Sequence, residues 1–490
     1  MNSLEDYFGT YRRNIIGNDF KHSFHSGVKP IIYADWAASG RLYKPIENYI
    51  STLLGPYVAN THTETTLTGT VMTHAYHQAH DIIKNHVNAS QDDVLLFAGF
   101  GMTAVINKMQ RILGLRVPEK YKSALIAKEK NRPLVIVTHM EHHSNQTTWE
   151  ESLCDVQIIR RNDNGLPDPD HLHDILKANK DRPFIIGSFT ACSNVTGIIT
   201  PYYQMAELIH EYGGYCFIDF SASAPYLPIN MHPENPKQQL DAIFFSPHKF
   251  LGGPGSSGVI VFNKNLYHNT VPDHPGGGTV YWTNPWGEHR FFENIEVRED
   301  GGTPGFLQAV KASLAILLKE EMGLENIHQR EEQLKDLLFN RLDRIHSLHL
   351  FEKQQLHRVG YFSFYSPGIH HNLFVKLLND KYGIQTRGGC TCAGTYGHIL
   401  FQINPNESKE ITNLIDHGDL SKKPGWVRIS LHPTMTDNDV EYIANAVEEI
   451  IKYYDNWKND YRFDHKTGDF YPKNYQKFSI DIKESFRKFQ

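Results

Sequence analysis

The stretch 242–258, AIFFSPHKFLGGPGSSG, decides the fold. Its apolar start is typical of a buried strand and ends shortly before Lys249, and a glycine-rich segment follows. A second apolar run, 215–218, ends at Asp219. A lysine and a carboxylate that each follow a buried strand suit pyridoxal phosphate (PLP), because the amine forms a Schiff base with the cofactor and the acid pairs with its pyridinium nitrogen. This pair predicts a PLP enzyme.

Strand-like and helix-like runs alternate on both sides of this stretch. The predicted strands lie at 93–97, 133–138, 156–159, 184–188, 215–218, 242–245 and 258–262, with helical patterns such as 102–113 and 202–212 between them. Such alternation favours an α/β fold with a mostly parallel sheet that is covered on both faces. Ligands of these sheets bind at the carboxyl ends of the strands, where Asp219 and Lys249 fall.

From about residue 305 the pattern changes to long helices, followed by shorter strands and a last helix. These elements are predicted at 306–322, 324–345, 359–365, 426–431 and 437–454. We therefore expect a large PLP-binding domain at 31–304 and a smaller α/β domain at 305–454. Residues 1–30 form an N-terminal segment in this division, and residues 455–490 form a tail that wraps the surface.

Composition limits the function classes. The chain has 490 residues, 40% of them hydrophobic, and a formal net charge of −6 without a long basic run, which argues against nucleic acid and for a small-molecule substrate. No secretory signal and no apolar run of the roughly 20 residues that span a bilayer is present, so we expect a cytoplasmic protein without membrane contact. Five scattered cysteines are expected as free thiols: Cys154, Cys192, Cys216, Cys390 and Cys392.

A glycine-rich turn at 97–107, FAGFGMTAVIN, follows one predicted strand and opens a helix. Its glycines let the backbone approach an anion, and the amides and hydroxyl at Met102 and Thr103 lie at the positive helix end. A phosphate is the expected ligand, although such a turn is often only a turn. Ser246 and Thr303 add hydroxyl donors.

Three histidines follow another strand in HMEHHSNQTTWE at 139–150. They would suit a metal, but no matching Cys, Asp or Glu ligands are close in sequence, so we predict no metal site. An imidazole stacked on the cofactor ring fits the position at the strand end better, and His142 is our choice for it.

Two cysteines lie one residue apart in the glycine-rich segment RGGCTCAGTYG at 387–397. An accessible thiol on a mobile loop is what nucleophilic sulfur chemistry needs, whereas two buried cysteines that fill space are the alternative. Arg428 suits a substrate carboxylate through a bidentate fork, with a structural ion pair as the competing interpretation. Asn194 suits the same carboxylate, the phenolic oxygen of the cofactor, or a plain turn.

Together these motifs resemble the class V aminotransferase-like PLP enzymes, and within them the cysteine desulfurase and selenocysteine lyase group. The segments that carry the resemblance, over roughly residues 30–452, are YADWAASGR, GMTAVIN, MEHHSN, SNVTG, FIDFSASA, FSPHK, GGTPG, RGGCTCAG and VRISL. The resemblance implies PLP fold-type I, the aspartate aminotransferase-like fold. It also implies a homodimer with the active site at the subunit interface.

The resemblance also implies individual roles. Lys249 would be the Schiff-base lysine, Asp219 the partner of the pyridinium nitrogen, and His142 the stacking imidazole. The phosphate contacts would come from Thr103, Ser246 and His248, with Met102 beside them and Thr303 from the partner subunit.

On the substrate side, Asn194 and Arg428 would hold the carboxylate, and Cys392 would form the persulfide behind Arg387. Two departures from the family pattern affect the choice of substrate. Ala222 stands where relatives carry Gln or His, and the loop reads CTC where many have histidines before the cysteine.

The predicted function is a PLP-dependent desulfurase-type lyase that converts L-cysteine to L-alanine and an enzyme-bound persulfide, with selenocysteine as an alternative substrate and a sulfur-acceptor protein as a partner. Another class V reaction, by an epimerase, a C–S β-lyase or a kynureninase-like hydrolase, needs no loop thiol and is the second hypothesis. A non-catalytic scaffold is the third, and an intact Lys249 and Asp219 speak against it.

Overall fold

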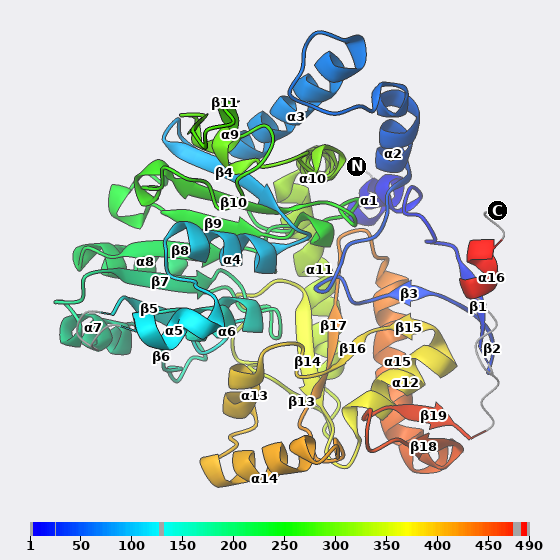
Figure 1. Cartoon of the computed structure of the whole chain (residues 1–490). Helices are drawn as coiled ribbons and strands as arrows, with labels where there is room; N and C mark the ends of the chain where they lie inside the picture. The colour runs from blue at the N-terminus through cyan, green and yellow to red at the C-terminus, as the bar shows by residue number, and fades with distance from the viewer. Residues whose placement is uncertain (1–2, 25, 127–131, 474–481, 488–490) are drawn as a thin grey trace.

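The fold has two sheets with their helices, one built from the middle of the chain and one from its C-terminal part (Figure 1). The computed structural model describes residues 3–24, 26–126, 132–473 and 482–487. Parts of the predicted N-terminal segment, large domain and tail (1–2, 25, 127–131, 474–481 and 488–490) therefore lie outside the described residues.

The larger sheet has seven strands in the order β4-β10-β9-β8-β7-β5-β6. All neighbours are parallel except β10, which is antiparallel to both β4 and β9. The prediction of a mostly parallel sheet is confirmed, and each strand lies close to its predicted position. The strands are β4 (Asp93–Ala98), β5 (Leu134–Thr138), β6 (Asp155–Ile159), β7 (Ile185–Thr190), β8 (Tyr215–Asp219), β9 (Ala242–Phe245) and β10 (Gly258–Asn263).

Strand β5 shows why these runs are continuously apolar. Leu134 and Ile136 pack into one buried cluster, and Val135 and Val137 pack into a second, because successive side chains point to opposite faces of a sheet. Helices α4 (Met102–Ile112) and α6 (His143–Glu150) cover the second cluster. The first is covered by α3 (Leu67–His86), α7 (Pro169–Ala178), α8 (Tyr202–Glu211) and α10 (Phe306–Met322).

The smaller sheet is antiparallel, in the order β13-β14-β17-β16. Its strands are β13 (His349–Leu350), β14 (Tyr361–Tyr365), β16 (Arg387–Gly389) and β17 (Trp426–Ser430). Helices α11 (Leu324–Leu342), α12 (His371–Tyr382) and α15 (Asp437–Trp457) accompany it. Nearby, β15 (Ile384–Gln385) pairs in parallel with β3 (Ile32–Tyr33).

The remaining elements are shorter. They are α1 (Leu4–Arg12), β1 (Lys21–Phe24), β2 (Gly27–Pro30), α2 (Lys44–Asn48), α5 (Glu119–Leu125), β11 (Val280–Thr283), β12 (His289–Phe291), α9 (Ile295–Glu299), α13 (Gly394–Leu400), α14 (Pro405–Asp416), β18 (Tyr461–Phe463), β19 (Phe470–Pro472) and α16 (Ile482–Arg487). In the described part of the chain, no helix combines the length and the apolar character that a membrane crossing needs.

The division at residues 31, 305 and 455 stays a prediction. Two observations bear on its boundaries. Strand β3 pairs with β15, so the chain just after residue 31 contacts the C-terminal part, and α15 continues through Trp457 beyond the predicted end at 454.

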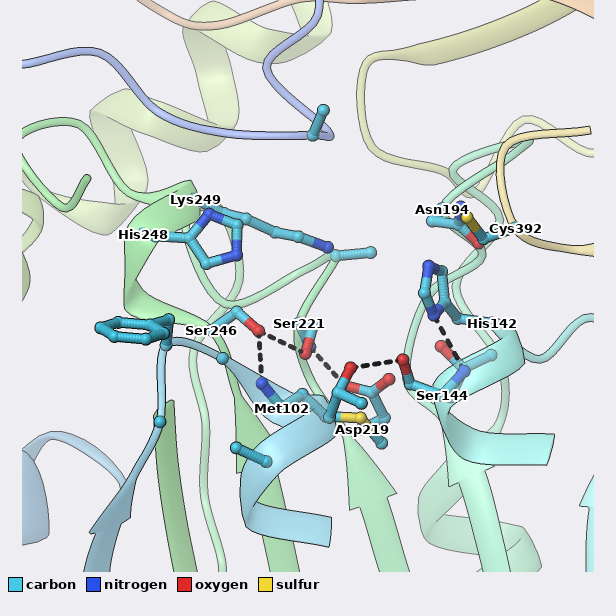
Figure 2. Close-up of a pocket in the computed structure, with 18 of the residues that line it drawn as sticks. Met102, His142, Ser144, Asn194, Asp219, Ser221, Ser246, His248, Lys249 and Cys392 are labelled. Atoms are coloured by element: carbon cyan, nitrogen blue, oxygen red, sulfur yellow. Dashed lines mark hydrogen bonds between the residues drawn. The ribbon is translucent and has the colours of Figure 1, made fainter. Parts of the chain in front are cut away.

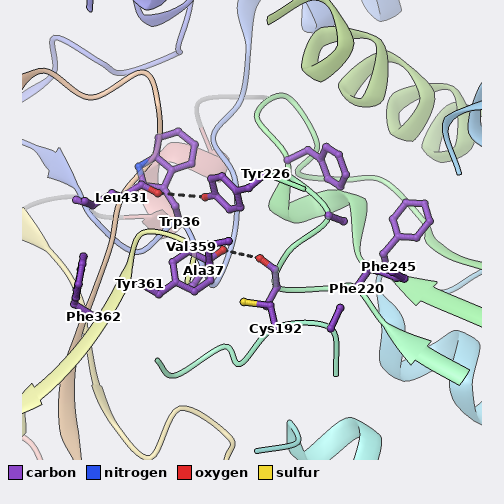
Figure 3. Close-up of a cluster of buried hydrophobic side chains, with 14 of the residues drawn as sticks. Trp36, Ala37, Cys192, Phe220, Tyr226, Phe245, Val359, Tyr361, Phe362 and Leu431 are labelled. Carbon is purple, nitrogen blue, oxygen red and sulfur yellow. Dashed lines mark hydrogen bonds between the residues drawn. The ribbon is translucent and has the colours of Figure 1, made fainter. Parts of the chain in front are cut away.

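A buried cluster joins the two sheets (Figure 3). Tyr361 of β14 donates a hydrogen bond to the carbonyl of Ala222, at 2.8 Å between the oxygens. Tyr226 donates to the carbonyl of Leu431 at 3.3 Å. Because Ala222 follows β8 and Leu431 follows β17, these bonds hold the smaller sheet against the strand ends where the site is predicted.

The glycine-rich segment after Lys249 is tightly packed, and this gives a stability prediction. A Cβ on Gly253 would lie 1.8 Å from the carbonyl oxygen of Pro247, so the backbone would have to move, whereas a Cβ on Gly277 would meet nothing within 4 Å. We expect Gly253→Ala to lower the free energy of unfolding by about 1–3 kcal/mol or more, measured by urea denaturation. Gly277→Ala is the control, and equal midpoints for the two variants would contradict this packing.

Candidate active site

A cavity of about 850 Å³ lies at the carboxyl ends of the parallel strands. The predicted site residues that line it are Met102, Thr103, His142, Asn194, Asp219, Ser246, His248, Lys249, Arg387, Cys392 and Arg428. Thr303 is exposed and is not part of this lining, so its supply by a partner subunit stays a prediction. The cavity is of the size that small-molecule and cofactor sites have.

Lys249 extends from one wall toward the wall that carries His142, Asn194 and Cys392 (Figure 2). It ends a short helical turn, Pro247–Lys249, that follows β9, and its backbone N–H donates to the carbonyl of Ser246 at 3.0 Å. Burial lowers the pKa of Lys249 to about 8, although the charge of Asp219 opposes this shift. The amine is therefore close to neutral at physiological pH, as imine formation requires.

Asp219 lies at the end of β8 and is 5% exposed. Its Oδ1 accepts a hydrogen bond from the backbone N–H of Ser221 at 2.8 Å. Burial raises the pKa of this carboxyl, while the bond from Ser221 and the charge of Lys249 act in the opposite direction. A protonated pyridine nitrogen would supply the cation that a buried carboxylate here calls for.

The first turn of α4 has the features of a phosphate site. Gly101 caps the helix without a side-chain hydrogen bond, and the backbone N–H of Met102 donates to Ser246 Oγ at 2.9 Å. Thr103 Oγ1 lies 2.6 Å from the hydroxyl of Ser144, which the sequence did not single out. His248 also lines this part of the cavity. Hydroxyls gathered at a helix N-terminus suit an anion such as phosphate.

His142 caps the start of α6. Its Nδ1 accepts a hydrogen bond from the backbone N–H of Ser144 at 3.1 Å, which fixes the ring at the wall opposite Lys249 (Figure 2). Burial lowers the pKa of His142 to about 3, with a further contribution from Lys249. A neutral, flat ring in this position suits stacking on an aromatic cofactor.

The arginines are held by an aspartate that sequence reasoning missed. Arg428 Nη2 lies 2.6 Å from Asp35 Oδ1, and Arg387 Nε lies 3.3 Å from Asp35 Oδ2. Arg428 Nη1 also donates to the carbonyl of Asn194 at 2.8 Å. The structural ion pair is thus present, and Arg428 still lines the cavity. Arg428 Nε and Asn194 Oδ1 are buried and have no hydrogen-bond partner among the described residues.

The cysteine loop forms a tight turn at the mouth of the cavity. Thr391 and Cys392 both have positive φ, 45° and 59°, and the N–H of Ala393 donates to the carbonyl of Cys390 at 3.0 Å. The carbonyl of Thr391 accepts from Asn194 Nδ2 at 2.8 Å. Cys392 is exposed and Cys390 is half-buried, so the interpretation that both are buried fillers is wrong.

These residues fit PLP. A near-neutral lysine, a buried carboxylate, a stacking imidazole and an anion site surround one cavity, and two buried polar atoms there lack partners. Lys249 would hold the aldehyde carbon, Asp219 the ring nitrogen, and Thr103 and Ser246 the phosphate.

The lowered pKa of Lys249 predicts how cofactor uptake depends on pH. Only the neutral amine adds to an aldehyde, and an amine loses its proton as the pH rises through its pKa. Since that pKa is about 8 here, the rate of PLP uptake by the apoprotein should rise up to about pH 8 and then level off. An ordinary lysine with a pKa of about 10.4 would give a rate that still rises at pH 9–10. Stopped-flow absorbance distinguishes the two outcomes.

Further residues of the cavity lay beyond the sequence predictions. They are Asp35 behind the arginines and the lining residues Ser144, Thr190, Cys192 and Ser221. Asp35 had one signal, its place in YADWAASGR just after the strand-like Ile32–Tyr33.

The sheet and the residues at its strand ends define a PLP enzyme of fold-type I. The chain belongs to the Aminotransferase class-V family, which it matches over residues 32–443. This is an enzyme family that uses PLP, so the predictions of fold class, cofactor and enzymatic nature are confirmed.

Relatives and solved structures agree with this assignment. A cysteine desulfurase from Haloferax volcanii is 25% identical over 373 residues, which cover 74% of this chain and 81% of that protein. A probable cysteine desulfurase from Staphylococcus epidermidis is 27% identical and covers 74% of this chain and 84% of its own. The apo structure of a cysteine desulfurase from Thermococcus onnurineus NA1 shares the fold, with a TM-score of 0.71 at 22% identity, over 92% of this chain and 99% of that one.

Proposed function

We propose that the protein is a PLP-dependent cysteine desulfurase-type lyase, which forms L-alanine from L-cysteine and leaves the sulfur as a persulfide on Cys392. Selenocysteine is a second substrate of suitable chemistry. The observation that carries the proposal is that an exposed thiol, Cys392, and the near-neutral amine of Lys249 line the same cavity. The names of the relatives support it.

The first steps concern binding and proton transfer. Bound PLP supplies an electron sink that makes the α-proton of an amino acid acidic. Lys249, with a pKa of about 8, accepts that proton as a general base of suitable strength. Arg428 and Asn194 orient the substrate carboxylate, with Asp35 holding the guanidinium of Arg428 in place.

The sulfur step belongs to Cys392. Its thiolate attacks the substrate sulfur, so an S–S bond forms while the bond between that sulfur and the substrate β-carbon breaks. The electron pair of the broken bond stays on the carbon side, which gains a proton and becomes the methyl group of alanine. Cysteine and a thiol thus give alanine and a persulfide, with no external oxidant or reductant.

The assembly and location are part of the same proposal. We place the protein in the cytoplasm as a homodimer in which the partner subunit supplies a second Thr303, and a sulfur-acceptor protein takes the product. Large exposed apolar side chains around the hairpin β11–β12 support an interface there: Tyr281, Trp282 and Trp286 are 54%, 47% and 83% exposed.

One observation favours a second candidate. Ala222 lines the cavity where relatives carry Gln or His, so a different class V reaction, by an epimerase, a C–S β-lyase or a kynureninase-like hydrolase, has room for another substrate. Such a reaction needs no loop thiol.

A product assay separates the candidates. The PLP-loaded protein is mixed with L-cysteine and dithiothreitol, and alanine and sulfide are quantified. We expect equimolar alanine and sulfide, because each persulfide reduced by the thiol corresponds to one alanine. Pyruvate with sulfide would instead indicate a β-lyase, D-cysteine would indicate an epimerase, and either result would contradict the proposal.

A further inference from the structure

The turn formed by Cys390, Thr391 and Cys392 separates two cavities. One is the active-site cavity, and the other is a cavity of about 300 Å³ on the far side of the turn. Cys392 lines both cavities, whereas Cys390 lines only the second. The C-terminal tail contributes Gly468 to the wall of this second cavity. A thiol that cannot contact the substrate therefore faces a space of its own.

The turn keeps the two cysteines close. Positive φ at both central residues, with a bond from Ala393 N–H to the carbonyl of Cys390, is the pattern of a type I′ turn. Such a turn brings its first and fourth Cα atoms within about 7 Å, so its first and third residues, Cys390 and Cys392, lie within the separation that an S–S contact allows. Rotation of the side chains is enough to bring sulfur to sulfur.

The second cavity favours anionic sulfur. Its described lining includes Lys423, Arg387 and His371 and no acidic residue, and Lys423 forms no ion pair within the part of the chain that the structure describes. The charge of Lys423 contributes to the lowered pKa of His371, where burial is the larger cause. A thiolate or persulfide anion in this cavity faces positive charge, which stabilises it and makes it the better nucleophile.

One side of Cys390 is apolar. The side chain packs against the buried cluster that contains Ala393, Tyr396 and Trp426, and it remains half-buried rather than closed off. Filling space would need only this packed side. The open side, toward the basic second cavity, is what a carrier of sulfur needs in addition.

We propose that Cys390 is a second sulfur carrier, which takes the sulfane sulfur from Cys392 and presents it in the second cavity. This rests on the proposed function. The thiolate of Cys390 attacks the outer sulfur of the persulfide on Cys392, so a new S–S bond forms on Cys390 as the old one breaks, and Cys392 leaves as a thiolate. The proton on the outer sulfur moves with it, and no electrons are gained or lost overall. Cys392 is then free to attack the next substrate while the acceptor works from the far side.

Locating the sulfur tests the relay. Full-length, PLP-loaded protein is given limiting L-cysteine without an acceptor thiol, alkylated and digested, and the persulfide is placed by fragmentation mass spectrometry. We expect sulfur on both Cys390 and Cys392 in the unaltered protein and on neither in Cys392→Ala. In Cys390→Ser we expect it on Cys392 alone, with slower sulfide release to dithiothreitol as the added probe. Cys154→Ala, which removes a thiol from neither cavity, should give the unaltered distribution.

The outcomes separate the relay from the proposed function. Alanine formation with all of the sulfur on Cys392, and with equal sulfide release in Cys390→Ser, would overturn the relay and leave the desulfurase reaction in place. Absence of alanine would overturn the desulfurase reaction and the relay with it. Retained PLP absorbance in Cys390→Ser shows that this variant is folded.

Discussion

Lys249→Ala is expected to abolish the reaction. The amine of Lys249 is the group that would join the cofactor and the base that would take the α-proton, so the variant loses both roles at once. Loss of the base alone costs about 10²–10⁴-fold in rate, and we expect alanine formation from cysteine to fall by at least that factor. Alanine quantification under saturating cysteine measures this loss, and the absorbance of the Schiff base should disappear with it.

Lys264→Ala is the matched control for this experiment. Lys264 is half exposed and pairs with Asp92 at 2.6 Å, away from the cavity lining. Its loss should leave alanine formation close to that of the unaltered protein. If Lys249→Ala kept a Schiff-base spectrum and a comparable rate, another lysine would hold the cofactor and the site would be misassigned.

Cys392→Ala is expected to retain the cofactor and lose the sulfur chemistry. Cys392 is exposed at the mouth of the cavity and no residue of the cofactor site depends on its side chain, so PLP absorbance should be unchanged. Without its thiolate nothing accepts the substrate sulfur, because the remaining thiol of the turn, Cys390, does not line this cavity. We expect alanine formation from cysteine to fall by about 10²-fold or more, measured in the presence of dithiothreitol.

Cys192→Ala gives the comparison, since Cys192 also lines the active-site cavity. It is fully buried, donates to the carbonyl of Gly197 at 3.1 Å, and burial raises its pKa, so it is a poor nucleophile. Its loss should cost far less alanine formation than the loss of Cys392. Undiminished turnover in Cys392→Ala would mean that the reaction needs no loop thiol, as in the β-lyase, epimerase and hydrolase alternatives.

Much of the fold was predictable because its signals are local. The seven strands of the large sheet are short apolar runs bounded by turn residues, and they lie where the runs are. The antiparallel direction of β10 was not predictable, since its run, Gly258–Asn263, reads like those of its parallel neighbours. Direction is decided by the short connection from β9, which passes through Lys249 and the glycine-rich segment.

The site was predictable to the extent that its residues follow strands. Asp219 and Lys249 do so directly, and the structure places them in one cavity. Asp35 was missed because its partners, Arg387 and Arg428, are distant in sequence and meet it only through pairing with the smaller sheet. The second cavity was also hidden, because its wall combines the cysteine loop with the tail at Gly468.

The central claim is that Lys249 carries the cofactor in the cavity that Cys392 adjoins. Borohydride reduction of the PLP-loaded protein, followed by digestion and peptide mass mapping, tests it most directly because reduction makes the bond permanent. The account predicts a phosphopyridoxyl group on Lys249 and on no other lysine. A fully loaded protein in which Lys249 stays unmodified, or in which another lysine carries the group, would contradict it.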